Sequence, residues 1–568
     1  MGKTIGSFTF VLHSHLPYVL SHGQWPHGTD WLHEAALGCY LPLVRTLRSL
    51  AAAGRAPQVT LGVTPVLAEQ LADPDFRSEF TDYLDQRITS AGRDLREFQR
   101  QGRPRMAELA ARWRDTYQDL GAFFHDELRG DILGALRELS AQGQIELITC
   151  GATHGYFPLL STDASIRLQV AQAIKTHQHH FGLKPQGIWL PECAYRPAYR
   201  WKPPVGEGPE RDRVGVEEIL AQYGISYFIT DSHMLMGGEA IGTYLDRFKA
   251  LERLWDRSQS GAAPAPAALD KSTLETYWVG SRPDQEEVAA IFTRDPETAL
   301  TVWSAEVGYP GDGWYLDFHK KHFPGGLKYW RVTKAQSDLG DKEPYQPEMV
   351  EARLDENADH FVGVIKSRLR HHLERTGQAG HLTAPFDTEL FGHWWFEGPR
   401  FLEKVLTLLA DDPEVELMSC GRRLAADPPT QVISLPEGSW GQGGFHWIWL
   451  NQDTEWTWPH VYECEEAMFE LLALPDCRRG TLGRVIDQAS RELLLLQASD
   501  WQFLISTWSA RDYAEMRFSQ HLADFRRLAR LARDLAGGGQ MGPGDAAFLE
   551  ACQARDRLFA EPALDHYK

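Results

Sequence analysis

Short hydrophobic runs that end in polar residues recur along the chain up to about residue 400. Stretches with helical periodicity separate most of them, so the pattern predicts buried parallel strands joined by helices. Such a sheet, closed or nearly closed into a barrel, carries its chemistry at the carboxyl ends of the strands. The runs are TFVLHSHLPY (9–18), QVTLGVTPVL (58–67), IELITCGATHGYFP (145–158), QGIWLPECAYRP (186–197), ISYFITDSH (225–233), TALTVWSAEVGYPG (298–311) and AGHLTAPFDTELFGHWWFEG (379–398).

Two stretches interrupt this alternation, and a third region replaces it. Residues 73–139 are charged and patterned as helices, which predicts a helical insertion. Residues 236–290 are rich in Gly, Ala and Pro, which predicts a long mobile loop. Helical periodicity dominates from 401 to 568. We therefore expect a barrel built from residues 1–72 and 140–400, followed by a helical C-terminal domain.

Charge and cysteine usage narrow the class of protein. The net charge of −20 argues against a nucleic-acid partner and against docking on an anionic membrane, whereas a neutral sugar or peptide is unaffected. The seven cysteines are scattered and form no CxxC pair, which indicates reduced thiols and a cytoplasmic protein. The N-terminal apolar run breaks at HSHLP and is better explained as a first buried strand than as a signal peptide. No apolar run approaches the ~20 residues of a membrane span.

Two carboxylates at predicted strand ends are candidates for catalysis. Glu192 follows the apolar run of GIWLPECAYRP, where it is either a nucleophile at a barrel mouth or a solvated or capping residue. Asp387 and Glu389 follow a second run in FDTELFGHWWFEG, where Asp387 is either catalytic or the cap of a short helix. Glycoside chemistry needs two carboxyl groups, one to attack or activate water and one to protonate the departing oxygen.

Histidines and tryptophans accompany these acids. His13 and His15 are two apart on a strand and so face the same side, and with His154 and an Asp they could hold a metal. We favour hydrogen bonding to a polar substrate, with no metal. The segment SWGQGGFHWIWLNQDTEWTW (439–458) contains five tryptophans, of which Trp440 and Trp449 are equally suited to sugar stacking or to a domain core.

Taken together, the motifs resemble glycoside hydrolase family 57, most closely its 1,4-α-glucan branching enzymes. Five segments in the family's order carry the resemblance, and LLLLQASDWQFLISTWSARDYAEMRFSQH (493–521) extends it into the helical region. The five are HSHLPY (13–18), GATHGYFP (151–158), GIWLPECAYRP (187–197), APFDTELFGHWWFEG (384–398) and SWGQGGFHWIWLN (439–451). The resemblance implies an α/β fold, an incomplete (β/α)7 barrel with a helical insertion domain and a helical C-terminal domain that covers the cleft.

The resemblance also implies roles for individual residues. Glu192 is the expected nucleophile and Asp387 the general acid/base of a retaining transfer from an α-1,4 to an α-1,6 linkage, with no cofactor. Tyr244 in the 236–290 segment is the expected mobile-loop tyrosine. The other expected contacts to an α-1,4-glucan such as amylose or glycogen are Arg294, Gly311, Trp440, Asp500, Trp303, Trp449, His13, His15 and His154.

Three alternatives stay open. A 4-α-glucanotransferase or α-amylase on the same fold would use the same carboxylates, and the linkage in the product separates them. A catalytically silent glucan-binding protein would have no reason to keep both Glu192 and Asp387. A zinc-dependent enzyme using His13, His15, His154 and an Asp would be sensitive to chelators. A monomer is plausible.

Overall fold

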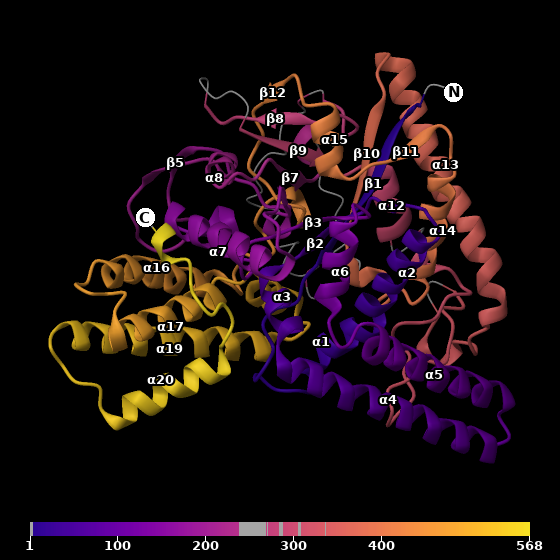
Figure 1. Ribbon diagram of the computed structural model, residues 1–568, viewed down its shortest axis with the longest axis horizontal. Helices are drawn as coiled ribbons and strands as arrows, with labels where there is room; N and C mark the ends of the chain where they lie inside the picture. The colour runs from indigo at the N-terminus through magenta and orange to yellow at the C-terminus, as the bar shows by residue number, and fades with distance from the viewer. Residues whose placement is uncertain are drawn as a thin grey trace.

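A ring of parallel strands lies at the centre of the protein (Figure 1). In the order of pairing, one sheet runs β10-β1-β2-β3 and a second runs β4-β7-β9. Their bounds are β1 (Gly6–Ser14), β2 (Thr60–Val63), β3 (Glu146–Ile148), β4 (Gly187–Ile188), β7 (Tyr227–Thr230), β9 (Ala289–Thr293) and β10 (Gly380–Asp387). The computed structural model describes residues 4–237, 251, 269, 271–282, 288–304, 308–334 and 337–567.

Single bridges join the two sheets at two seams. Thr149 pairs with Ile188 next to β3 and β4, and Arg294 pairs with Thr383 next to β9 and β10. Seven parallel strands of the described chain thus form a ring that is not one continuous hydrogen-bonded ladder. The predicted incomplete (β/α)7 barrel is confirmed, and the ring remains open in the sense that neither seam is a full strand pair.

Strand β1 fixes the register at the carboxyl ends of the strands. All nine of its residues are buried, as expected for a parallel strand covered on both faces. It pairs with β10 from Gly6 opposite Gly380 to His13 opposite Asp387. The parallel register therefore places the HSH motif of β1 beside the FDTE motif that ends β10.

Helices form a second ring around the strands. Successive contacts run α8, α7, α6, α2, α14, α13 and α12, so these helices cover the outer face of the sheets. Their bounds are α2 (Leu41–Ala52), α6 (Ile132–Ala141), α7 (Asp163–Phe181), α8 (Val216–Gln222), α12 (Pro296–Trp303), α13 (Pro347–Thr376) and α14 (Gly398–Ala410). Other helices of the barrel are α1 (Thr29–Ala35), α3 (Pro65–Ala72), α9 (His233–Met236) and α15 (Cys420–Ala426).

The helical insertion is a hairpin of α4 (Pro74–Arg100) and α5 (Pro104–Ala122), seen at the lower right of Figure 1. Asp73 caps α4 by accepting a hydrogen bond from the backbone N–H of Asp75, and Pro74 occupies the first turn. The expected end of the insertion at residue 139 is too late. Helix α6 (Ile132–Ala141) packs on α2 and α7 and so belongs to the barrel.

Two other expectations about local structure are corrected. The run at 298–311 is not a strand, because Pro296 starts helix α12 and the strand β9 lies just before it. The expected single loop at 236–290 contains strand β8 (Tyr277–Val279), which pairs antiparallel with β9 and parallel with β12 (Val432–Ile433). Most of that segment, including Tyr244, lies outside the described residues.

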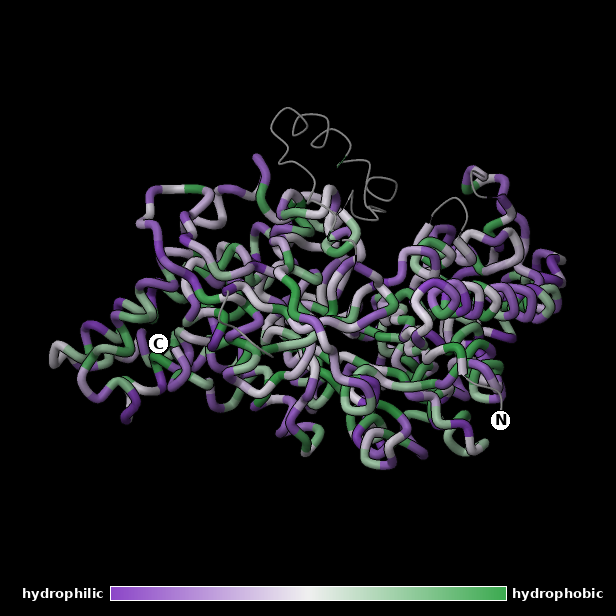
Figure 2. The backbone as a smooth tube through the Cα atoms, turned by 90° about the horizontal axis from the view of Figure 1, so that it is seen from above, coloured by the Kyte–Doolittle hydropathy of each residue, from purple (hydrophilic) through white to green (hydrophobic). Residues whose placement is uncertain are grey.

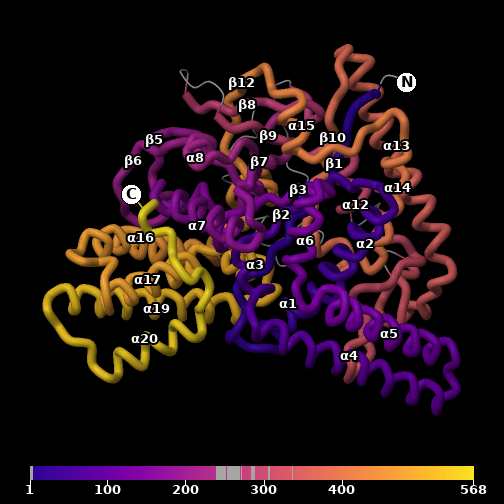
Figure 3. Tube along the Cα trace, viewed as in Figure 1, coloured from indigo at the N-terminus to yellow at the C-terminus, as the bar shows by residue number. Residues whose placement is uncertain are grey.

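The helical C-terminal region starts later than the expected residue 401. Strand β11 (Val415–Leu417) pairs with β1, and β12 pairs with β8 of the second sheet. These residues therefore still belong to the sheets of the barrel domain. The helices that follow are α16 (Trp458–Leu472), α17 (Gly480–Leu496), α18 (Asp500–Thr507), α19 (Arg511–Ala536) and α20 (Pro543–Arg555). The labelled helices α16, α17, α19 and α20 lie at the end of the molecule opposite the barrel helices α13 and α14 (Figure 3).

Hydrophobic positions gather toward the middle of the molecule, and hydrophilic positions follow the peripheral helices (Figure 2). A hairpin of β5 (Tyr199–Trp201) and β6 (Arg211–Arg213) lies outside the ring. No helix within the described part of the chain is both long and apolar enough to cross a membrane.

Candidate active site

Glu192 sits on a strained turn immediately after β4. It has φ 61° and ψ 26°, and the next residue, Cys193, also has a positive φ of 48°. Left-handed backbone is unfavourable for side chains of this size and persists only where the surroundings impose it. Here the backbone N–H of Trp440 donates to the Glu192 carbonyl at 3.1 Å, and that of Cys193 to the Leu190 carbonyl at 2.8 Å. The turn thus directs a carboxylate into the barrel mouth.

Two side chains hold the Glu192 carboxyl group. The indole Nε1–H of Trp440 donates to Oε2 at 2.8 Å, and the Ser499 hydroxyl approaches Oε1 at 3.4 Å. The pKa of Glu192 is raised to about 8, mainly by burial and also by the nearby negative charges of Asp387 and Asp500, against the lowering effect of the Trp440 hydrogen bond. Glu192 is therefore a buried acid whose ionisation depends on its neighbours.

Asp387 ends β10 opposite His13 and interacts electrostatically with Glu192. The turn η8 (Thr388–Leu390) begins directly after it, but the Asp387 side chain makes no capping hydrogen bond to that turn. The alternative explanation that Asp387 is there to cap a helix therefore has no support in the geometry. Asp387 and Glu192 instead form the pair of interacting carboxyl groups that the sequence suggested.

A third acid, Glu389, lies buried next to this pair. The Tyr40 hydroxyl donates to its Oε1 at 2.5 Å, and the backbone N–H of His15 donates to the same atom at 3.1 Å. Burial raises the pKa of Glu389 to about 8, with Asp387 adding to the effect. Glu389 therefore links β1, helix η1 (Ala36–Tyr40) and the turn after β10, a positioning role that the sequence pattern did not reveal.

The three predicted histidines meet as expected from their strand ends. His15 and His154 stack with ring centroids 3.9 Å apart, and the Nε2 atoms of His13 and His154 lie 3.2 Å apart. His15 Nε2 is hydrogen-bonded to both carboxylate oxygens of Asp500, at 3.0 and 3.1 Å. Burial lowers the pKa of His13 and His154, so both rings are neutral at physiological pH.

The C-terminal helices complete the site through the turn between α17 and α18. Ser499 Oγ lies 2.8 Å from His154 Nδ1, and the Ser499 backbone N–H donates to the His154 carbonyl at 3.0 Å. Asp500 starts α18 directly after this turn. Sequence reasoning selected Asp500 and missed Ser499, although the serine is its neighbour in the ASDW motif.

Aromatic rings pack around the same region, and two of them, Trp189 and Trp449, are fully buried. Trp189 stacks on His13 at 4.7 Å and meets Trp440 edge-on at 5.2 Å. Trp449 is 0% exposed and stacks on Tyr156 at 4.4 Å, so its ring packs inside the protein in this structure. The sequence pattern did not indicate that Trp189 would contact His13 and Trp440, because only the acid of the WLPE motif was interpreted.

Arg294 approaches the site from the end of β9. Its guanidinium lies 5.8 Å from the centre of the Trp440 ring and forms a buried ion pair with Asp231. Although burial opposes ionisation of Asp231, Arg294 and His233 hold the pKa of that carboxyl below its usual range. Asp231, at the end of β7, is thus an unpredicted partner that fixes Arg294.

The remaining predicted contacts lie on the connection between β9 and α13. Trp303 is the last residue of α12, and its ring is 6.5 Å from that of Phe386, the residue before Asp387. Gly311 ends the short turn η6 (Tyr309–Gly311). Tyr244 lies outside the described residues, so its expected role stays a prediction.

The predicted zinc-binding alternative maps onto two overlapping clusters. His15, His154 and Asp500 form one, and His13, Cys150 and His154 form the other. Both lie beside Glu192, because His154 Nδ1 is 3.8 Å from its Oε1. The sequence named the histidines and an Asp, but it did not indicate that Cys150 would join them.

Comparisons with known proteins identify relatives of this chain. A family model described as "Glycosyl hydrolase family 57" matches residues 9–436, and one described as "1,4-alpha-glucan branching enzyme, C-terminal" matches residues 460–567. The chain is 41% identical to a 1,4-alpha-glucan branching enzyme of Thermococcus kodakarensis, over 99% of this chain and 78% of that protein.

Solved structures show the same likeness in three dimensions. The crystal structure of the T. kodakarensis branching enzyme, in complex with glucose and additives, matches with a TM-score of 0.89 and 40% identity, covering 99% of this chain and 96% of that one. The α-amylase AmyC of Thermotoga maritima matches with a TM-score of 0.79 and 26% identity, covering 99% of both chains.

Proposed function

The chain belongs to glycosyl hydrolase family 57, and from that premise we propose that it is a 1,4-α-glucan branching enzyme. The enzyme cleaves an α-1,4 linkage in a glucan and transfers the released segment to a 6-hydroxyl group, which creates an α-1,6 branch. The observation that carries the mechanism is the pair of interacting carboxyl groups, Glu192 on the turn after β4 and the part-buried Asp387 at the end of β10.

In the first step, a Glu192 carboxylate oxygen attacks the anomeric carbon of the donor glucan. Asp387 gives its proton to the departing glycosidic oxygen, so the α-1,4 bond breaks as a glucosyl ester forms on Glu192. In the second step, the 6-hydroxyl of an acceptor glucan attacks the anomeric carbon of that ester and passes its proton to Asp387. Glu192 leaves as a carboxylate, and two inversions give net retention.

This chemistry requires one proton to be shared by two carboxyl groups. Glu192 must be ionised to attack while Asp387 must be protonated to donate. Burial and the neighbouring negative charges disfavour ionisation of both groups at once, as the raised pKa of Glu192 reflects. The Trp440 hydrogen bond favours the ionised form of Glu192, and so it moves the proton toward Asp387.

The surrounding residues orient the nucleophile and the sugar. Ser499 connects His154 to Glu192, so a residue of the C-terminal helices positions the reacting carboxylate. His13 and His154 provide neutral hydrogen-bonding groups for sugar hydroxyls, and His15 stacks on His154 beside them. Arg294, Trp440 and Asp500 are the proposed contacts to the donor glucan, and they lie near one another or beside the histidines. Trp303, Gly311 and Tyr244 remain expected contacts on the neighbouring connections.

Transfer to a glucan rather than to water distinguishes branching from hydrolysis. The 26% identity to an α-amylase keeps hydrolysis as the competing activity, because the same two carboxyl groups can serve it. Branching requires that water be excluded while the acceptor is bound. The aromatic side chains around Glu192, together with the match of residues 460–567 to the branching-enzyme C-terminal region, favour transfer.

The deciding experiment follows the products formed from amylose. Proton NMR reports new α-1,6 anomeric signals, and a reducing-end assay reports hydrolysis. We expect α-1,6 signals with few new reducing ends, and neither change with Glu192→Gln. New reducing ends without α-1,6 signals would make the protein a hydrolase. An unmodified amylose would favour a silent glucan-binding protein.

A neutral α-glucan as the partner fits the acidic chain, since its net charge of −20 neither attracts nor repels uncharged sugar. The seven cysteines are all free, which supports the prediction of a reducing, cytoplasmic location. A monomeric state stays a prediction that light scattering on the purified protein would test.

A further inference from the structure

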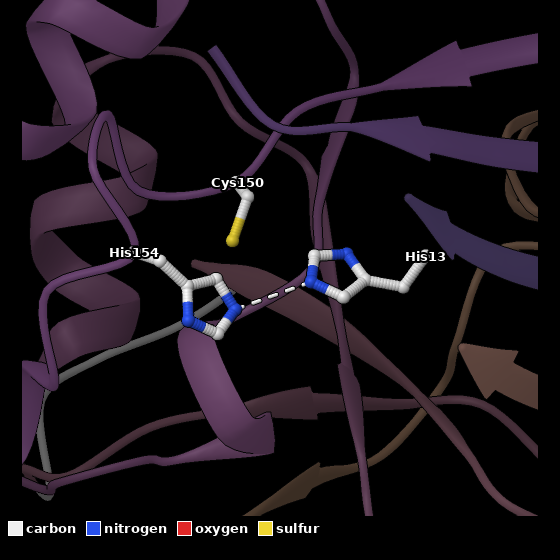
Figure 4. Close-up of side chains that lie close together, drawn as sticks. All are labelled: His13, Cys150 and His154. Carbon is white, nitrogen blue, oxygen red and sulfur yellow. Dashed lines mark hydrogen bonds between the residues drawn. The ribbon is translucent and has the colours of Figure 1, made fainter. Parts of the chain in front are cut away.

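A pair of histidines and a cysteine face one another at the base of the candidate active site. Figure 4 shows His13, Cys150 and His154, with the cysteine sulfur directed toward the space between the two rings. His13 comes from β1, whereas Cys150 and His154 come from the segment after β3. Their potential ligand atoms all lie within 4.8 Å of one another.

We propose that His13, Cys150 and His154 form a binding site for a thiophilic divalent metal such as Zn²⁺, and that metal bound there inhibits the enzyme. Zinc takes histidine nitrogen and cysteine sulfur in tetrahedral sites, with three protein ligands and one open position in many cases. The Glu192 carboxylate lies beside the other nitrogen of the His154 ring, with its Oε1 3.8 Å from Nδ1.

The distances fit this coordination with little movement. Tetrahedral zinc with Zn–N bonds of about 2.0–2.1 Å places two ligand nitrogens about 3.3 Å apart. The Nε2 atoms of His13 and His154 are 3.2 Å apart, so the two rings are already placed to share one ion. A zinc-bound sulfur lies about 3.6 Å from each nitrogen, so Cys150 needs to approach by no more than about 1.2 Å.

The groups around the cluster also suit a cation. Ser499 Oγ lies 2.8 Å from His154 Nδ1, so the hydroxyl can accept the Nδ1–H and orient Nε2, the usual arrangement for a ligating histidine. His13 Nδ1 is buried and has no hydrogen-bond partner among the described residues, which leaves the tautomer of this ring unconstrained. Glu192 and Asp500 both act electrostatically on Cys150 and so supply negative charge.

Proton balance follows from the neutral rings. Each imidazole keeps one proton, moved to Nδ1, while the metal takes the Nε2 lone pairs. The Cys150 thiol loses its proton to solvent on coordination, despite the raised pKa that burial gives it. One proton is therefore released for each metal ion bound. The bound dication occupies both Nε2 atoms and attracts the Glu192 carboxylate, so glycosyl transfer stops.

The other clusters among the described residues are less suitable. His22, His521 and Asp556 also group together, but Arg517 and Arg555 contact them and would repel a cation. His15, His154 and Asp500 overlap the proposed site, but His15 and Asp500 already satisfy each other through two hydrogen bonds. Within the part of the chain that the structure describes, only the His13–Cys150–His154 group offers a sulfur ligand beside two histidine nitrogens.

The experiment titrates Zn²⁺ and Co²⁺ into the reduced, chelator-treated full-length protein. We expect one equivalent of Zn²⁺ to bind with release of one proton, measured by calorimetry in buffers of different ionisation enthalpy. Co²⁺ should give a thiolate charge-transfer band. Cys150→Ser should weaken Zn²⁺ binding by more than about 100-fold, because even the partners of metal ligands affect affinity by 10–100-fold. Cys464→Ser, at another buried cysteine, should match the wild type.

Inhibition rests on the proposed function, whereas the binding and cobalt measurements do not. Zn²⁺ should suppress branching reversibly, and Cys150→Ser should keep wild-type activity in chelator and lose the inhibition. Absence of saturable binding would overturn the proposal. So would binding that survives Cys150→Ser but is lost in Asp500→Asn, which would assign the metal to the His15 cluster. If Cys150→Ser fails to fold, Cys150→Ala and the wild-type cobalt spectrum decide the question.

Discussion

Replacing Glu192 by glutamine should stabilise the protein at neutral pH while it removes catalysis. In the folded protein, burial raises the pKa of Glu192 from 4.5 to about 8. The folded state therefore holds the proton between these two values, whereas the unfolded state has released it. The stability that this group contributes is complete below about pH 4.5 and is lost as the pH rises through about 8.

The size of the effect follows from the difference between the two pKa values. At pH 7, the raised pKa of Glu192 lowers the free energy of unfolding by about 1.4 kcal/mol for each pH unit above 4.5. The total is about 3 kcal/mol relative to low pH. Glutamine carries no charge, and its amide oxygen can still accept the Trp440 hydrogen bond. For a chain of this length, about 3 kcal/mol corresponds to a rise in melting temperature of roughly 2–3 °C.

The assay is thermal unfolding of wild type and Glu192→Gln at pH values from 5 to 8. The gain should be small at pH 5, about 0.7 kcal/mol, and should grow steadily as the pH rises. Glu550→Gln, at an exposed glutamate on α20, is the matched control and should show no such trend. A Glu192→Gln gain that is independent of pH, or a loss of stability at pH 7, would refute the reasoning.

Three further predictions concern the neighbours of Glu192. Asp387→Ala should lower branching of amylose by several orders of magnitude with an unchanged melting profile, because the departing oxygen loses its proton donor; near-wild-type turnover would remove Asp387 from the mechanism. Trp440→Phe should move the acidic limb of the kcat/KM profile to higher pH, because the lost hydrogen bond favours ionised Glu192; a profile that keeps its wild-type limb would contradict that role. Arg294→Ala should cost about 3–5 kcal/mol in unfolding free energy by leaving Asp231 buried without its partner, and adding Asp231→Asn should restore part of the loss; a double variant no more stable than Arg294→Ala would argue against the ion pair as the cause.

The site depends on segments that are far apart in the sequence. Glu192 is held by Trp440 and Ser499, and its turn is strained by left-handed backbone. The motifs identified the acid because a carboxylate after a buried strand has few structural explanations. They did not identify Ser499 or Asp231, because a lone serine or aspartate in a sequence has many possible partners.

The boundaries of the domains show the same limit. Helical periodicity after residue 400 suggested a helical domain, but β11 returns to pair with β1 and β12 with β8. Strands of two or three residues leave too short a hydrophobic pattern to be recognised. The pairing partner, rather than the local sequence, makes these residues strands.

By itself the sequence determined the parallel strand pattern, the helical insertion, and the two acids at strand ends. The spacing of hydrophobic residues along the chain indicates which segments are buried strands and which are helices. The sequence also determined the family, through five motifs in a fixed order. Only the tertiary structure decided that Trp449 packs inside while Trp440 binds Glu192, and that Cys150 faces His13 and His154. These outcomes depend on which distant segments of the chain pair as strands or pack together, and the local sequence does not indicate those partners.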